Sequence, residues 1–220
     1  MPTKPLAIGE EVVRRKAFAW AIDWPGWCRA GKDPVLAREA LLAYRPRYAV
    51  VAEAAGLALS DAATAAADIV ESVEGGSGTE FGVPSAITDL DRRPVTAAEA
   101  KRVAGLVEAA WTVFDSVAAS APAELRKGPR GGGRDRDKMI GHVIEADHAY
   151  AREIGVRLPA GSLTDRAAVA TERAAVLDVL GQASDGTPLA GRRWTQRYAA
   201  RRIAWHALDH AWEMEDRAEP

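Results

Sequence analysis

All four histidines of the chain lie in two stretches of its C-terminal half, IGHVIEADHAY and IAWHALDHAWE. In the second stretch, His206 and His210 are four residues apart, so on a helix their imidazoles lie one turn apart on the same face. Two such imidazoles can chelate one divalent ion. The pair therefore predicts a metal site, although the same spacing also fits a plain polar patch on a helix.

A metal site of this kind needs another ligand from a facing helix, and the candidates are His142 and His148. At about 100° per residue, the two side chains fall on opposite flanks of the apolar side that Met139, Val143 and Tyr150 mark. Periodicity alone leaves both histidines open as the third ligand.

Two acidic residues are candidates for supporting the metal or for catalysis. Glu213 projects within roughly 40° of the histidine pair, where it could be a fourth ligand, an orienting partner or a proton acceptor. Asp147 points toward the apolar side of its helix, where an unpaired carboxylate would be costly, so we expect it to contact an arginine or a ligand histidine.

Arg202 is the candidate for binding a thiol cofactor or acidic substrate, because it projects toward the histidine stripe. It belongs to a group of arginines at the start of the last helix. The alternative is a solvated face whose arginines pair with acidic residues. The other members of the group are Arg192, Arg193, Arg197 and Arg201.

Helical segments must position these residues, and four are expected in the C-terminal half. They cover about 96–120, 135–156, 164–182 and 194–216, with Gly- and Pro-containing breakers between them. Four amphipathic helices of this length pack well as a four-helix bundle. The stretch 76–95 is dense in Gly, Pro, Ser and Asp and is expected to be a linker. We therefore divide the chain into a domain at 1–75, a linker at 76–95 and a bundle at 96–220.

The N-terminal segment has the pattern of a small α+β domain, so the chain as a whole is expected to be mainly α. Residues 16–22 alternate like a half-buried strand, and a turn and a short second strand follow. Asp33 and Pro34 are typical of a helix start, and Pro46 should kink or split the helix predicted over 35–55. A further strand is predicted around 68–73.

Three tryptophans, Trp20, Trp24 and Trp27, lie within eight residues of one another. They could form the apolar wall of a ligand site, or they could be core where the small domain packs on the bundle. The single cysteine, Cys28, cannot form an internal disulfide, and we expect it to be a buried, inert thiol. A thiolate-rich zinc site is excluded for the same reason.

The charge and the hydrophobic pattern of the chain limit the classes of partner that it is expected to bind. The formal net charge of −2 gives no basic field for nucleic acid, and the sequence has neither an apolar run of bilayer length nor a secretion signal. We therefore expect a cytoplasmic protein that binds a small-molecule substrate, neither nucleic acid nor a membrane. A homodimer is compatible with the sequence.

The C-terminal part, with His142 in KMIGHVIEADHAYAREIG and the pair in RYAARRIAWHALDHAWEMEDR, resembles the DinB-like superfamily over about 96–217. The resemblance implies a four-helix bundle with one ligand histidine on the second helix and an H-x3-H pair on the last. It selects His142, His206 and His210 as the ligands and leaves His148 as an extra. The superfamily includes metal-dependent thiol S-transferases and mycothiol-dependent isomerases.

The segment FAWAIDWPGWCRAGKDPVLAREALLAY is similar to the small HicB-like fold, in which a strand ending in a D-x-P-G turn leads into a helix. The likeness covers about 14–75. Trp24 and Trp27 replace smaller residues of that family, so we do not carry over its antitoxin or RNA-binding role.

Together, these features predict a divalent-metal-dependent enzyme, most simply an S-transferase that uses a low-molecular-weight thiol. Three imidazoles leave open positions on Zn²⁺, the best match, or on Ni²⁺ or Fe²⁺, and an open position can bind a thiol. The alternative is a binding or interaction module that holds a metal or ligand without turnover.

Overall fold

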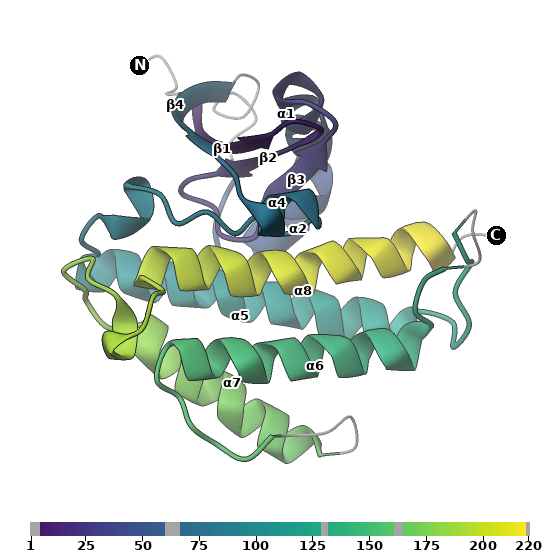
Figure 1. Cartoon of the computed structure of the whole chain (residues 1–220). Helices are drawn as coiled ribbons and strands as arrows, with labels where there is room; N and C mark the ends of the chain where they lie inside the picture. The colour runs from purple at the N-terminus through teal and green to yellow at the C-terminus, as the bar shows by residue number, and fades with distance from the viewer. Residues whose placement is uncertain (1–4, 60–66, 129–131, 161–164, 219–220) are drawn as a thin grey trace.

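The computed structural model describes residues 5–59, 67–128, 132–160 and 165–218. The chain is mainly α-helical with a small mixed sheet, as predicted (Figure 1). Within the described residues, the sheet has the order β3-β2-β1-β4, with β1 antiparallel to β2 and parallel to β4. The strands are β1 (Leu6–Val13), β2 (Lys16–Ala21), β3 (Cys28–Gly31) and β4 (Ala67–Glu74).

Strands β2, β3 and β4 match the predicted strands, whereas β1 was not recognised in the sequence. It contains two acidic residues, Glu10 and Glu11, whose exposed fractions are only 3% and 0%. Arg38 pairs with Glu10, and the backbone N–H groups of Ser85 and Ala86 donate to Glu11. These partners lie far away in the sequence, and they compensate the two carboxylates, so the acidic residues of β1 can be buried.

The predicted helix of 35–55 is split, as Pro46 requires. Helix α1 (Pro34–Ala43) begins where the Asp33 carboxylate accepts a hydrogen bond from the backbone N–H of Leu36. Helix α2 (Arg45–Ala54) follows after Tyr44 alone, with Pro46 in its first turn.

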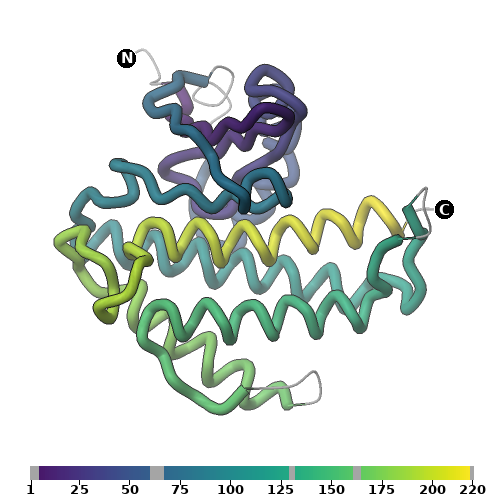
Figure 2. The backbone as a smooth tube through the Cα atoms, viewed as in Figure 1, coloured from purple at the N-terminus to yellow at the C-terminus, as the bar shows by residue number. Residues whose placement is uncertain are grey.

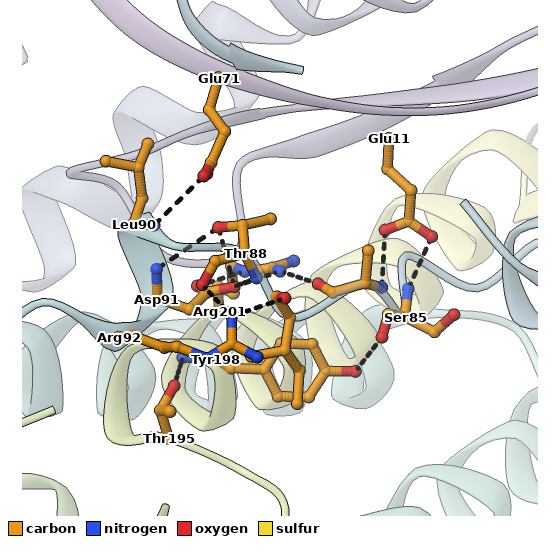
Figure 3. A network of polar contacts seen from close by, with 12 residues as sticks. Glu11, Glu71, Ser85, Thr88, Leu90, Asp91, Arg92, Thr195, Tyr198 and Arg201 are labelled. Carbon is orange, nitrogen blue, oxygen red and sulfur yellow. Dashed lines mark hydrogen bonds and ion pairs between the residues drawn. The ribbon is translucent and has the colours of Figure 1, made fainter. Parts of the chain in front are cut away.

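The segment 76–95, expected as a linker, makes polar contacts both with the N-terminal sheet and with the last helix. It contains α4 (Ser77–Glu80) and the short 3-10 helix η1 (Leu90–Arg92). Figure 3 shows Asp91 paired with Arg201 of the last helix, while Glu11 of β1 accepts hydrogen bonds from the neighbouring Ser85 region. Both oxygens of the buried Asp91 meet the Arg201 guanidinium, at 2.9 and 2.7 Å.

The four long helices are found where the sequence predicts them. They are α5 (Ala97–Ser120), α6 (Arg136–Glu153), α7 (Arg166–Leu180) and α8 (Gln196–Ala218). In Figures 1 and 2, α5 and α8 lie next to the N-terminal sheet and its helices, and α6 and α7 lie on the far side. Among the described residues, α5 alone is long and apolar enough to cross a membrane, but 56% of its most apolar window is buried, which is typical of a core helix.

Helix α8 lies between the N-terminal sheet and the other long helices, and it is buried on nearly every side. Trp205 packs with Phe18, Trp20 and Cys28 of the sheet. On the neighbouring turn, Gly26 lies against the side chains of α8. The N-terminal part and the four long helices therefore share one continuous core.

The tryptophan cluster belongs to this shared core. The fully buried Trp27 donates from its indole N–H to the Leu41 carbonyl and stacks on Tyr48, which also meets Trp24 edge-on. Cys28 is buried as predicted, and burial raises the pKa of its thiol, which favours the unreactive thiol form.

Candidate metal centre

Three histidines from α6 and α8 converge on one point. The Nε2 atoms of His142 and His206 are 3.2 Å apart, and each ring centroid lies within 5.0 Å of the other two. One nitrogen from each ring can be chosen so that all three lie within 4.8 Å of one another. The two helices thus bring together residues that are 64 positions apart in the sequence.

The spacing of these nitrogens suits a small divalent ion. Two ligands on a tetrahedral centre, each about 2.0 to 2.1 Å from it, lie about 3.3 Å apart. The distance of 3.2 Å between His142 and His206 is close to that value. It is also a normal N–H···N hydrogen-bond distance, which is how the two rings can contact each other without an ion.

Burial keeps the rings in the form that binds metals. Burial is the main cause that lowers the pKa of His206 to about 2, and the neighbouring His210 contributes to this shift. Burial is also the main cause that lowers the pKa of the half-buried His142. Both imidazoles are therefore neutral near pH 7 and can offer a nitrogen lone pair. The buried Nδ1 of His206 has no hydrogen-bond partner among the described residues, so this ring is incompletely satisfied.

Glu213 is hydrogen-bonded to His210, a contact compatible with the orienting role, one of the three considered for it from the sequence. The Nδ1–H of His210 donates to the Glu213 carboxylate at 3.0 Å, and this hydrogen bond is the main cause that lowers the pKa of Glu213. The Nε2 of His210 is then the nitrogen left to bind an ion. Arg217, one turn further along α8, donates to the other oxygen of Glu213 at 2.7 Å and holds the carboxylate in place.

Arg202 borders the histidines through Tyr150. It lies one turn before His206 on α8 and donates from Nη2 to the Tyr150 hydroxyl at 3.0 Å. The Tyr150 ring meets His206 edge-on, and the ring of Trp205 lies beside the guanidinium. The Nη1 of Arg202 is buried and has no partner in the described parts of the chain. Arg202 therefore has a free donor beside the histidine triad.

The other arginines of this group mostly pair with acids, which matches the alternative that the sequence left open. Arg192 pairs with Glu153, Arg197 with Glu99 and Arg201 with Asp91. The Arg201 pair is buried, however, so that part of the group is not a solvated face.

Asp147 and His148 lie away from the histidine triad. Asp147 faces α5 and α7, where Arg173 is its charged neighbour at 3.7 Å and Trp111 lies beside it. His148 contacts Glu172 of α7 at 2.5 Å. The expected arginine beside Asp147 is thus present, but the structure places neither residue in contact with His142, His206 or His210.

Sequence reasoning missed Tyr150 and Arg217. Arg217 could have been identified from the sequence, because Glu213 and Arg217 form an i, i+4 pair on the helix that carries the histidines. Nothing in the sequence indicates a role for Tyr150, since it lies eight residues from His142 and its spacing is that of the apolar side of α6.

Comparison with known proteins identifies no relative: no protein-family profile, curated protein or solved structure matches the chain.

Proposed function

We propose that this chain is a divalent-metal-dependent enzyme of the DinB-like superfamily, in which His142, His206 and His210 hold one ion. The observation that carries the proposal is the convergence of three imidazole nitrogens, from two helices, within 4.8 Å of one another. Zn²⁺ fits best, because three neutral imidazoles with an open position form a common catalytic zinc site. Ni²⁺ and Fe²⁺ accept the same ligands.

The chemistry that best suits such a centre is S-transfer from a low-molecular-weight thiol. When bound, the ion supplies Lewis acidity that favours the thiolate form of the thiol. The reaction forms a bond from sulfur to an electrophilic carbon and breaks the bond from that carbon to its leaving group. The thiol proton and the leaving group are released.

The residues around the triad have distinct roles in this proposal. Glu213, held by Arg217, fixes the ring orientation of His210. Arg202 offers its free Nη1 donor to a carboxylate of the thiol or substrate, because a guanidinium binds carboxylates strongly. Asp147 contacts Arg173 and Trp111 and none of the three histidines, so we assign it no catalytic role.

The finer fold assignments are proposals as well. We propose that α5 to α8 form a DinB-like four-helix bundle and that the N-terminal sheet with α1 and α2 is HicB-like. The supporting features are the positions of the four long helices and the strand, turn and helix around Pro25 and Gly26. We also propose that the chain acts in the cytoplasm on a small molecule.

One observation favours the second candidate, a metal-binding module without turnover. His206 and His210 have exposed fractions of only 6% and 9%, and none of the three histidines lines either the crevice between α5, α6 and α7 or the small cavity beside Trp20. A structural ion would need no substrate space.

An assay with a metal-free control separates the two candidates. The purified protein is tested with monochlorobimane and a panel of thiols that includes cysteine, glutathione and mycothiol. An S-transferase shows activity with at least one thiol, loses it on chelation and regains it with added Zn²⁺. Metal binding without activity on any thiol supports the module, and full activity in metal-free protein contradicts the proposal.

A further inference from the structure

The histidine triad is most accessible at His142. His206 and His210 are buried, whereas His142 is only half-buried. Arg202, on the other side of His206, is held inside the protein by Tyr150 and Trp205. A molecule that comes from solvent therefore meets the triad on the side of His142.

The last turn of α8 fixes the position of Arg134, which comes shortly before α6. Arg217 donates from Nη2 to the Arg134 carbonyl at 2.9 Å and from Nη1 to Glu213, the hydrogen-bond partner of His210. The neighbouring Gly133 has φ +117°, and a Cβ there would lie 2.6 Å from Arg217 Nη2, so glycine suits this position on both counts. The backbone of Arg134 is thus connected to His210 through two side chains of α8.

The positive charge of Arg134 acts on two of the three histidines. Burial is the main cause that lowers the pKa of His142, and Arg134 is the next. Burial is also the main cause for His206, where Arg134 contributes in smaller measure. The Arg134 side chain is exposed, and its guanidinium has no salt bridge or hydrogen bond within the described parts of the chain. It is therefore free to bind a ligand beside the triad.

Acidic residues near the triad cancel only part of this charge. Both oxygens of Glu213 already accept hydrogen bonds from neighbouring side chains. Glu145 of α6 acts on the pKa of His142 in the opposite direction, but its effect is smaller than that of Arg134. Arg134 and the buried Arg202 thus lie on two sides of the triad, an arrangement that favours an anionic ligand.

We propose that Arg134 binds the carboxylate of an anionic low-molecular-weight thiol whose sulfur is bound at the histidine triad. This rests on the proposed function, because the triad must hold the ion that binds the sulfur. A guanidinium pairs with a carboxylate through charge-assisted hydrogen bonds, and salt weakens such a pair at an exposed position. Arg134 is a specificity residue in this role: it selects anionic thiols over neutral ones.

Thiol binding to the full-length protein loaded with Co²⁺ tests the role of Arg134 without an activity assay. Co²⁺ accepts the same imidazole ligands as Zn²⁺, and a bound thiolate adds a sulfur-to-cobalt charge-transfer band. The probes are 3-mercaptopropionate and the neutral 2-mercaptoethanol. The ratio of their two affinities is compared between variants, which removes the intrinsic difference between the two thiols.

Arg134→Gln should lower the preference for 3-mercaptopropionate about three- to fivefold at low salt, whereas Arg134→Lys keeps the charge and should retain most of the preference. In the wild type, about 0.5 M NaCl should reduce the preference toward that of Arg134→Gln. Arg152→Gln is the matched control, because Arg152 is an exposed arginine in the last turn of α6, about 15 Å along the helix from His142. It should leave the ratio unchanged.

The result distinguishes the role of Arg134 from the function that it serves. A charge-transfer band whose affinity ratio falls in Arg134→Gln but not in Arg152→Gln supports Arg134 as the carboxylate-binding residue. A band with the same ratio in Arg134→Gln and the wild type, or an equal fall in Arg152→Gln, overturns this role and leaves the proposed function standing. The absence of a band with either thiol overturns both.

Discussion

At the scale of single residues, the orientation of His210 depends on Glu213. The Glu213 carboxylate accepts from His210 Nδ1–H and is itself held by Arg217. Glu213→Gln should therefore weaken metal affinity by about 10- to 100-fold, the usual effect of removing an outer-sphere partner. Competition with a chromophoric chelator measures this affinity. Glu215→Gln, an exposed position two residues along α8, is the control, and an equal loss in both variants would argue against a specific role for Glu213.

Asp147 makes stability depend on pH. Burial raises the pKa of this carboxyl from 3.8 to about 7, with Arg173 opposing the shift only in part. Because the folded state then binds the proton more tightly than the unfolded state, the contribution of Asp147 to stability falls as the pH rises from about 4 to 7 and stays low above pH 7.

Asp147→Asn removes this dependence. Its stability relative to the wild type should increase by about 2 to 3 kcal/mol between pH 5 and pH 8, as measured by urea unfolding at each pH. Asp178→Asn, at an exposed position of α7, should show no such trend. A constant difference between Asp147→Asn and the wild type over this range would show that the buried carboxyl does not titrate there.

The grouping of the candidate metal ligands was only partly predictable from the sequence. The spacing of His206 and His210 is local, so the helix period sets their common face. The choice between His142 and His148 depends on which helix covers each flank of α6, and the sequence does not contain that information. In the structure, α8 covers the flank of His142 and α7 covers the flank of His148.

At the scale of elements, the turn between β2 and β3 sets the contact with α8. Gly26 has φ +91°, and a Cβ at this position would lie 2.7 Å from Leu208 Cδ1 and 2.9 Å from Ala204 Cβ. Gly26→Ala should therefore cost about 2 to 4 kcal/mol in the free energy of unfolding, from backbone strain and steric overlap together.

Gly56→Ala is the matched control. Gly56 has φ +68°, and a Cβ there would meet nothing within 4 Å, so the change should cost only about 1 kcal/mol of backbone strain. Chemical denaturation measures both variants. Equal losses would mean that the contact of the turn with α8 adds nothing to stability.

The elements themselves were largely predictable, because their signals are local. Asp33, Pro34 and Pro46 define the boundaries of α1 and α2, and Thr96 with Glu99 forms a capping box at the start of α5. Strand β1 was missed because its buried acids are stabilised by segments far away in the sequence.

At the scale of the whole molecule, the N-terminal part and the long helices depend on each other. Trp205, Leu208 and Trp212 of α8 have exposed fractions of 5% or less, and Trp205 contacts the sheet directly. A fragment of residues 96–220 would expose this face of α8, so we expect it to bind a hydrophobic dye and to unfold without a sharp transition. The full chain should unfold in one transition. A fragment that unfolds cooperatively without binding dye would contradict this expectation.

The proposed function requires that imidazoles from α6 and α8 hold one metal ion together. The most direct test is the zinc content of purified protein after incubation with Zn²⁺ and removal of free metal. We predict about one Zn²⁺ per chain for the wild type and for His148→Ala, and less than about one tenth of that for His142→Ala, His206→Ala and His210→Ala. A wild-type protein without zinc, or triad variants that retain it fully, would mean that the three histidines do not form a zinc site.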